Sequence, residues 1–388
     1  MVTSLAKYVG LRDLATAEDI AQEAFAEAAR KWSEQLPDHP EAWLYRVCRN
    51  IALNRLRKEK KFESDSLLND RSTPNDIEKL FETETGDHQL LMLLACAHPS
   101  FSARNQVIFA LRYVAGLRIE QIANVFGNSA ETITKTLQRM RGTIVRENIS
   151  LTPDISHATR EQSLTLHKVI YLMFSEGSKT SSGRSILNLE LCEDALSLGL
   201  AIANSKSLHL PETHALVALM LFNLSRFEAR FDDSGEPIEL EQQDRSKWNR
   251  EMIKVAVHHI TQAGEGVTPY HIEAAIAWLH TSAPSFAETD WMKIAALYER
   301  LILINDSPFV RMNRSIALFY AGDVLTSLHQ LKKLGENAFM QQHYLLHMAL
   351  GKVYKAADKP AEARKHFQKA FELSAHEPER RYIKKTYL

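Results

Sequence analysis

Apolar residues recur along nearly the whole chain at the three- and four-residue spacing of amphipathic helices. Strict alternation of apolar and polar residues, which marks a half-buried strand, is missing from the sequence, and so are β-branched runs bounded by Asn-Gly or Asp-Gly turns. The pattern therefore predicts an all-α protein. Near the start we expect helices at about 14–32 and 41–61, with Pro40 at a helix start, where proline is favoured.

The first expected helix separates its apolar residues from its polar ones. The residues expected on the inner, apolar stripe are Ile20, Ala24, Phe25, Ala28 and Trp32. The residues expected on the outer, acidic face are Glu18, Asp19, Gln22 and Glu23. Taken alone, this outer face is explained most simply as a solvated surface.

The segment 63–87 is expected to be a linker with a short helix around 76–81, because it contains a proline and has no sustained apolar face. A second compact block follows the linker. Its expected helices cover 88–96, 102–115, 118–125 and 129–146.

The last two helices of this block carry the most informative local pattern, "RIEQIANVFGNSAETITKTLQRM". Gly127 provides a turn, Ser129 can cap the following helix, and Ile133 and Leu137 form its buried side. Small Ala123 before the turn suits two helices that cross steeply. We therefore predict a helix-turn-helix. The residues expected to point outward from its second helix are Glu131, Thr132, Thr134, Lys135, Gln138 and Arg139.

From about Thr152 onward the chain is rich in Ala and Leu and is expected to form a helical repeat domain. The segment 343–374 has the spacing of a tetratricopeptide repeat, carried by Leu350, Gly351, Tyr354, Ala363, Phe367 and Ala370. The segments 290–308 and 309–334 fit the same scheme loosely. A lone repeat cannot bury its faces, so we expect a right-handed stack of helix pairs closed by a C-terminal capping helix.

Length and composition fit a soluble protein of two or three domains, with 388 residues of which 45% are hydrophobic. No signal peptide and no apolar run long enough to span a membrane is found, so a cytoplasmic location without membrane contact is expected. Cys48, Cys96 and Cys192 are widely spaced and are expected to be buried small groups.

The net charge of −1 hides opposite local charges. Residues 46–61 hold seven basic residues against one acid, a balance of +6, and residues 63–87 hold eight acids against two basic residues, a balance of −6. A charge run is usually a solvated helix face. The basic helix, however, also carries Trp43, Tyr45, Asn50 and Asn54, which suit base stacking and hydrogen bonding beside phosphate contacts. A second basic cluster, Lys135, Arg139, Arg141 and Arg146, makes two nucleic-acid surfaces plausible.

Patterns typical of enzymes and metal sites are missing. The segment "SEGSKTSSG" (175–183) lacks the glycine spacing of a phosphate-binding loop and is expected to be a turn between helices. The histidines show no metal-ligand spacing, and no catalytic constellation is found. We expect no catalytic activity, no cofactor and no metal.

The chain resembles the extracytoplasmic-function (ECF) group of bacterial sigma-70 factors, in the subgroup with a tetratricopeptide-type C-terminal extension. "DLATAEDIAQEAFAEAARKW" and "PDHPEAWLYRVCRNIALNRLRK" are similar to sigma region 2, and "HPSFSARNQVIFALRYVAGLRIEQIANVFGNSAETITKTLQRMR" is similar to region 4. The run from Gln243 to Trp248 is the most specific string of the extension. The implied domains are region 2 at 1–62, the linker at 63–86, region 4 at 87–149 and the extension at 150–388.

The resemblance implies partners and site residues. Core RNA polymerase would bind through its β′ clamp and its β subunit, and the residues implied at the clamp are Asp19, Gln22 and Glu23. Promoter DNA would be bound at the minus-10 element by Arg49, Asn50, Asn54 and Arg57. At the minus-35 element the implied residues are Ser129, then Thr132, Lys135 and Gln138 near base edges, and Arg139 and Arg141 near phosphates.

The leading hypothesis is therefore a transcription initiation factor whose extension regulates its activity, either by packing on region 2 or region 4 or by binding a peptide or protein. The acidic linker is also expected to shield the basic helix. One alternative is a helix-turn-helix regulator with a repeat-type sensing domain that acts without polymerase. Another is a scaffold whose repeats recruit proteins.

Overall fold

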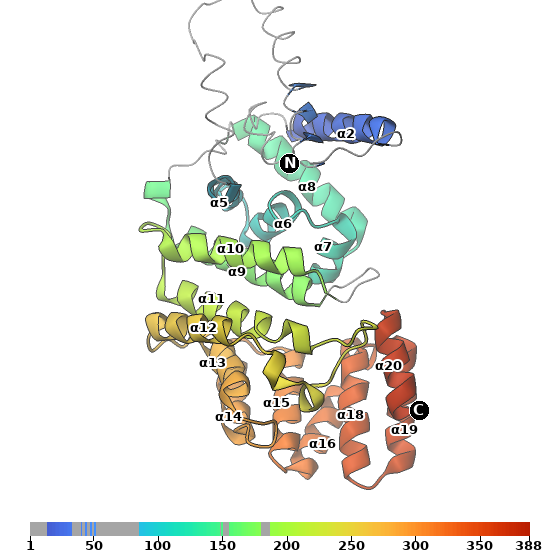
Figure 1. Ribbon diagram of the computed structural model, residues 1–388. Helices are drawn as coiled ribbons and strands as arrows, with labels where there is room; N and C mark the ends of the chain where they lie inside the picture. Colours follow the sequence, from blue (N-terminus) through green and yellow to red (C-terminus); the bar gives the residue numbers. More distant parts are fainter. Residues whose placement is uncertain are drawn as a thin grey trace, which may run out of the picture. The chain divides into compact units, whose positions relative to one another are not determined.

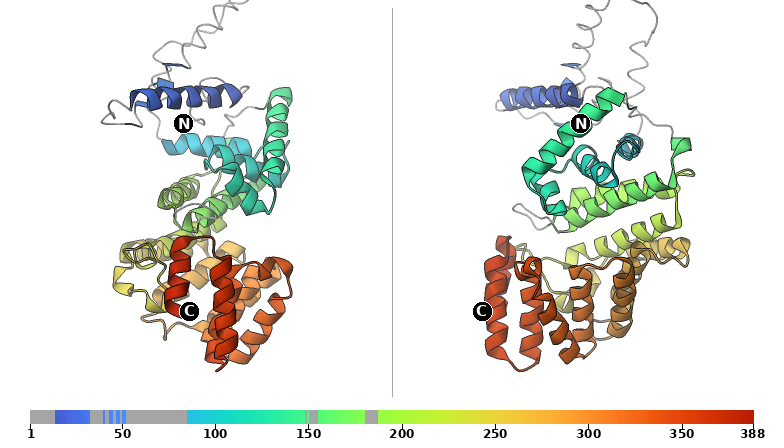
Figure 2. Two further views of the ribbon diagram at one scale, coloured as in Figure 1. Left: turned by 90° about the vertical axis from the view of Figure 1, so that its right-hand side faces the viewer. Right: turned by 180° about the vertical axis from the view of Figure 1, so that it is seen from behind.

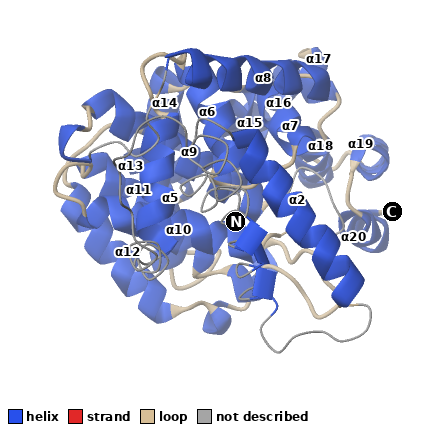
Figure 3. Cartoon of the chain, turned by 90° about the horizontal axis from the view of Figure 1, so that it is seen from above, coloured by secondary structure: helices blue, strands red, loops and turns tan. Residues whose placement is uncertain are grey.

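The computed structural model describes residues 14–32, 40, 43–44, 47–48, 50–51, 85–147, 149, 155–179 and 187–388. Regular structure in these ranges is helical, apart from an isolated β-bridge between Phe231 and Pro237 (Figure 1; Figure 3). The all-α prediction is confirmed. Within the described ranges, no helix is both long and apolar enough to cross a membrane.

The chain divides into two compact units. The first comprises residues 1–173 and 200–209, and the second comprises residues 174–199 and 210–388. The boundary falls inside α9 (Arg160–Ser178) and inside α10 (Leu189–Asn204). The first unit therefore includes parts of two helices that follow the domain boundary expected at 149–150.

The first described helix of the first unit is α2 (Leu14–Lys31), which matches the helix expected at 14–32. Ile20, Ala24 and Ala28 are buried, as the apolar spacing predicts. The prediction for Phe25 was wrong, because 54% of its surface is exposed. At 100° per residue Phe25 lies at the edge of the stripe, so the helix buries the small alanines and leaves the large ring outside.

Among the described residues, four further helices form the rest of this unit's core, together with the start of α9. They are α5 (Thr85–Cys96), α6 (Ala103–Tyr113), α7 (Ile119–Phe126) and α8 (Ala130–Glu147), each close to its expected range. The central helix is α6, which packs on α5, α7 and α8. Thr165 of α9 donates to Gln106 of α6 at 3.1 Å.

The second unit contains the end of α9, the first part of α10 and a series of further helices. They are α11 (Pro211–Leu224), α12 (Arg250–Ala263), α13 (Pro269–Ser282), α14 (Trp291–Ile304), α15 (Pro308–Tyr320), α16 (Val324–Leu334), α17 (Ala338–Gln341), α18 (Tyr344–Ala356), α19 (Pro360–Leu373) and α20 (Glu377–Tyr387). From α13 onward the main contacts join helices that are near neighbours in the chain. Such contacts are what a stack of helix pairs produces.

The helices α18 and α19 form the pair expected at 343–374, and they lie side by side in Figure 2. Gly351 makes their close approach possible, since a Cβ at this position would lie 2.5 Å from the ring of Phe367. The ring of Tyr387 on α20 stacks on Phe367 with centroids 4.2 Å apart. The last helix therefore covers the end of this pair.

The run from Gln243 to Trp248 has a structural role in the segment between α11 and α12. Trp248 is buried, and the guanidinium groups of Arg226 and Arg245 lie 5.3 and 4.4 Å from its ring centroid. Arg245 also donates to the carbonyl oxygens of His280 at 2.9 Å and Ala283 at 2.6 Å. Through these contacts the run holds the segment between α11 and α12 against the C-terminal end of α13.

The turn expected at 175–183 begins later than predicted, because α9 continues to Ser178. Gly177 lies inside the helix, and a Cβ there would be 2.7 Å from Sγ of Cys192. The glycine therefore permits close helix packing. Cys48, Cys96 and Cys192 are all buried free thiols, as expected.

We expect Gly351→Ala to lower the free energy of unfolding by about 1–2 kcal/mol, because overpacking against Phe367 outweighs the gain in helix propensity. Circular dichroism during chemical denaturation measures the change. A second substitution, Phe367→Leu, should recover part of the loss.

The matched control is Gly142→Ala in α8, where nothing lies within 4 Å of the added Cβ. That variant should be as stable as the parent or more stable by up to about 1 kcal/mol. If Gly351→Ala were equally stabilising, the close approach of α18 and α19 would be refuted.

Candidate nucleic-acid interface

The turn between α7 and α8 has a defined geometry that sets the direction of α8. Gly127 has φ 61° and ψ 37°, the left-handed conformation that glycine adopts at low cost. Asn128 donates its backbone N–H to Ala123 at 2.9 Å, and Gly127 donates to Asn124 at 3.2 Å. This pair of bonds is a Schellman motif, which satisfies the last carbonyl groups of α7.

The predicted cap of the next helix is present, since Oγ of Ser129 accepts the backbone N–H of Thr132 at 3.2 Å.

Arg104 of α6 supports this turn from outside the two helices. It donates to the side-chain oxygen of Asn128, and its guanidinium lies 5.3 Å from the ring centroid of Phe126. Sequence reasoning missed Arg104, because 24 residues separate it from Asn128 and no local spacing connects them. The turn is therefore fixed at both its backbone and its side chains.

The face of α8 that points away from the core is polar and basic. Ile133, Leu137, Met140 and Ile144 form the buried stripe. The exposed minus-35 candidates are Ser129, Thr132, Lys135, Gln138 and Arg139. At 100° per residue, the four on the helix fall within an arc of about 120° opposite the buried stripe. They can therefore face one partner together.

Charges on this face are solvent-accessible. Lys135 forms an ion pair with Glu131 at 2.6 Å, and both side chains are more than half exposed. Exposed pairs of this kind contribute at most about 1 kcal/mol and are screened by salt. Lys135 can therefore exchange this acid for a phosphate at little cost.

Arg141 is placed differently from the other minus-35 candidates. Its Nε donates to the hydroxyl oxygen of Tyr113 at 2.7 Å, and its guanidinium lies 5.7 Å from that ring centroid. It is half-buried and lies about 180° around the helix from Thr132. Arg141 therefore packs against α6 and does not belong to the exposed face of α8.

The acidic candidates lie together on α2. Asp19, Gln22 and Glu23 are all exposed. They span an arc of about 100° opposite the stripe formed by Ile20 and Ala24. The side chain of Glu18 is outside the described residues. The face is thus continuous, acidic and open to solvent.

Only part of the minus-10 candidate set can be placed. Asn50 is exposed, whereas Arg49, Asn54 and Arg57 lie outside the described residues. Trp43, expected to stack on bases, is half-buried and packs against Trp32 with ring centroids 5.6 Å apart.

Two family models match parts of this chain. Residues 1–62 match the family model of sigma-70 region 2, and residues 163–264 match a family of unknown function, DUF6596. An uncharacterized protein of Rhizobium meliloti (strain 1021) is 32% identical over 382 residues, which cover 96% of this chain and 89% of that protein. The probable RNA polymerase sigma factor RfaY of Xanthomonas campestris pv. campestris is 30% identical over 157 residues, or 38% of this chain and 37% of RfaY.

Residues 1–62 therefore carry a sigma-70 region 2, and part of this chain is similar to a probable RNA polymerase sigma factor. The whole chain belongs to one family with the Rhizobium meliloti protein, because the two sequences align over nearly their whole lengths.

Proposed function

We propose that this chain is an ECF-group sigma factor that binds core RNA polymerase and directs initiation at specific promoters. The observation that carries this proposal is the match of residues 1–62 to sigma-70 region 2, followed in the chain by a capped helix pair with an exposed basic face. We assign region 2 to 1–62, the linker to 63–86, a region 4 helix-turn-helix to 87–149 and a tetratricopeptide-like extension to 150–388.

In this proposal α8 is the recognition helix for the minus-35 element. Thr132, Lys135 and Gln138 lie on its exposed face, where they can reach base edges in the major groove. Arg139 on the same face would contact a phosphate. Arg141 would contact a phosphate only through its two terminal NH2 groups, because its Nε donates to Tyr113. Ser129, as the helix cap, would set the position of the helix end.

The exposed acidic face of α2 would dock on the β′ clamp of core polymerase, and the β subunit would complete the partner surface. Asp19 and Glu23 can pair with basic groups there, and Gln22 can donate and accept hydrogen bonds. Asn50 is exposed, so its side chain can reach DNA at the minus-10 element. Arg49, Asn54 and Arg57 complete that proposed set.

The second unit would regulate initiation, as a covalently attached domain whose packing or ligand changes the availability of the DNA-binding surfaces. Its concave surfaces could also take a peptide or a protein. This proposal is supported by the size of the extension and its independent compactness.

We expect Gln138→Ala to change the preferred base at one minus-35 position, with a loss of about 1–3 kcal/mol in discrimination, because one base-edge contact is removed. Promoters selected from a library randomised at this element, with core polymerase present, report the preference. Arg139→Ala should instead weaken binding about equally across all sequences and reduce its salt dependence.

The matched control for this experiment is Gln368→Ala, an exposed glutamine on α19. It should leave the selected sequences unchanged. Equal weakening of all sequences by Gln138→Ala would argue against a base contact by that residue.

Run-off transcription with purified core polymerase tests both the function and its regulation. The full chain should produce a promoter-dependent transcript. A chain that ends at His209 retains the described part of the first unit, including α9 and α10, and should give a different transcript yield, because most of the second unit is removed.

The two outcomes separate the two proposals. A full chain that binds promoter DNA alone yet yields no transcript with core enzyme would contradict the sigma function. Equal transcript from the full and shortened chains would contradict only the regulatory role of the extension.

A further inference from the structure

A cavity of about 390 Å³ in the second unit is lined by more cations than acids. It lies among the end of α9, the end of α11 with the segment that follows, and the first turns of α18 and α20. Its ionisable lining residues include Lys179, Arg226, Arg230 and Glu379, three positive charges against one negative charge. The nominal balance of these four groups is +2, and a buried charge without a partner is costly.

The two arginines have no carboxylate partner within ion-pair distance among the described residues. Arg230 donates to the carbonyl oxygen of Ser178 at 3.3 Å and packs against Phe227 and Phe231. Arg226 donates to Gln243 at 3.2 Å, and its buried Nε has no hydrogen-bond partner. The donors of these groups therefore exceed the acceptors that the cavity supplies.

The one acid in the lining is already engaged. Glu379 accepts hydrogen bonds from the hydroxyl groups of Tyr344 and Ser374, the latter at 2.9 Å, and lies 3.5 Å from Lys179. Burial, together with the charges of Arg230 and Arg245, lowers the pKa of Arg226 to about 10. Burial also lowers the pKa of Lys179, and Arg230 adds to that effect while Glu379 opposes it. The cations that line this cavity therefore repel one another.

In another cavity of the same unit the arginines are paired with carboxylates. Arg311 and Arg314 line it, and Arg311 forms two bonds to Asp306 at 2.6 and 2.8 Å. Arg314 pairs with Glu299. Both arginines in that cavity have a carboxylate, whereas Arg226 and Arg230 have none among the described residues. Lys333 also lines that cavity, so the first cavity differs in the missing carboxylate partners of its arginines and not in its nominal charge.

A more apolar cavity of about 300 Å³ adjoins the cationic one, because both are lined by Pro237, Tyr344 and Glu379. The rest of its lining includes Ile316, Phe319, Met348 and Ile383. The two cavities together offer a positive end and an apolar end. A molecule that fills both would carry a negative group on an apolar body.

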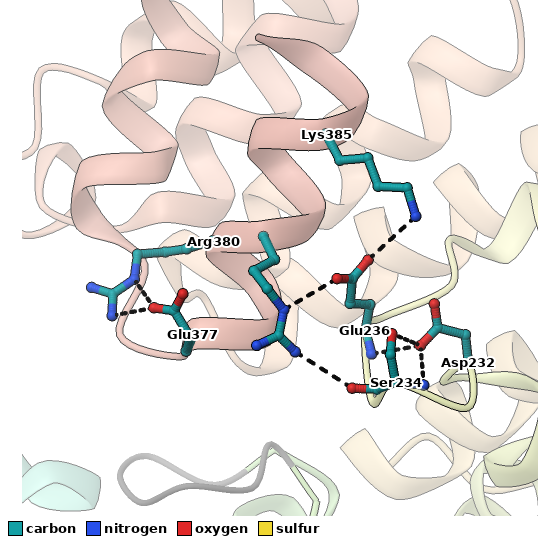
Figure 4. A network of polar contacts seen from close by, with 7 residues as sticks. Asp232, Ser234, Glu236, Glu377, Arg380 and Lys385 are labelled. Carbon is teal, nitrogen blue, oxygen red and sulfur yellow. Dashed lines mark hydrogen bonds and ion pairs between the residues drawn. The ribbon is translucent and has the colours of Figure 1, made fainter.

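The wall that the two cavities share is held in place by ion pairs. Glu236, next to Pro237, pairs with Arg381 at 3.2 Å and with Lys385 at 3.7 Å, and both partners are on α20 (Figure 4). Asp232 accepts the backbone N–H groups of Ser234 and Glu236, each at 2.9 Å (Figure 4). Pro237 therefore has a fixed position between α20 and the arginines.

We propose that this cavity binds a small organic anion, with a phosphate or carboxylate group between Lys179, Arg226 and Arg230 and an apolar body in the adjoining cavity. Charged hydrogen bonds from arginine suit either anionic group. The site uses Lys179 of the segment 175–183 without the glycine spacing of a phosphate-binding loop. The proposal concerns the second unit alone and does not depend on polymerase binding.

Isothermal titration calorimetry of the full chain tests this site with four probes. Phenyl phosphate and benzoate distinguish the two anionic groups, inorganic phosphate lacks the apolar body, and phenol lacks the charge. We expect one of the first two to bind at one site per chain and more tightly than either inorganic phosphate or phenol. The proposal is overturned if neither phenyl phosphate nor benzoate binds, or if phenol binds as tightly as they do.

Three substitutions locate the bound probe. Lys179→Met and Arg230→Gln should each weaken binding by about tenfold or more, because each removes a charged hydrogen bond. Glu379→Gln should strengthen binding, since it removes the only acid among the four charged groups, and a folding defect would not produce this gain. Arg311→Gln, the matched control in the other cavity, should leave the affinity unchanged.

Affinity that survives both Lys179→Met and Arg230→Gln would overturn the proposed location. Circular dichroism spectra of the variants show whether each retains its helices, so a loss of binding through unfolding is separated from the loss of one contact.

Discussion

One-sided burial of its helices is the constraint on which the rest of this structure depends. Each fully buried Leu or Ile side chain contributes about 1.5–3 kcal/mol, so a helix with a single apolar stripe cannot rotate to hide its polar face. On α2 the stripe of Ile20, Ala24 and Ala28 leaves Asp19 and Glu23 in solvent. On α8 the buried stripe likewise leaves Lys135 and Gln138 exposed. Both candidate interfaces are therefore consequences of the same packing rule.

Local patterns predicted local structure well and long-range contacts poorly. The ends of α7 and α8 and the cap at Ser129 could be predicted because caps and turns depend on residues a few positions apart. The helical period already places Arg141 about 180° from Thr132, but its bond to Tyr113 joins residues 28 positions apart and has no local signal in the sequence. Helical periodicity also predicted that Phe25 is buried, because a hydrophobic pattern does not take the size of a side chain into account.

The second unit shows what spacing alone cannot predict. Its close helix approach at Gly351 follows from the repeat pattern, but the cationic cavity does not, because its lining residues come from segments more than 200 positions apart. Unpaired buried cations lower the stability of the unit that holds them. Their position beside an apolar space is the observation on which the proposed anion site rests, and such a site would give the chain its own sensor.

The central claim is the proposal that the acidic face of α2 docks this chain on core RNA polymerase. The most direct test is the affinity of core enzyme for the full chain and for the variant Asp19→Lys with Glu23→Lys. The control, Glu251→Lys with Glu362→Lys, makes the same change of charge on exposed acids of the second unit. The account predicts a loss of about tenfold or more for the α2 variant and no change for the control. Wild-type affinity in the α2 variant would contradict it.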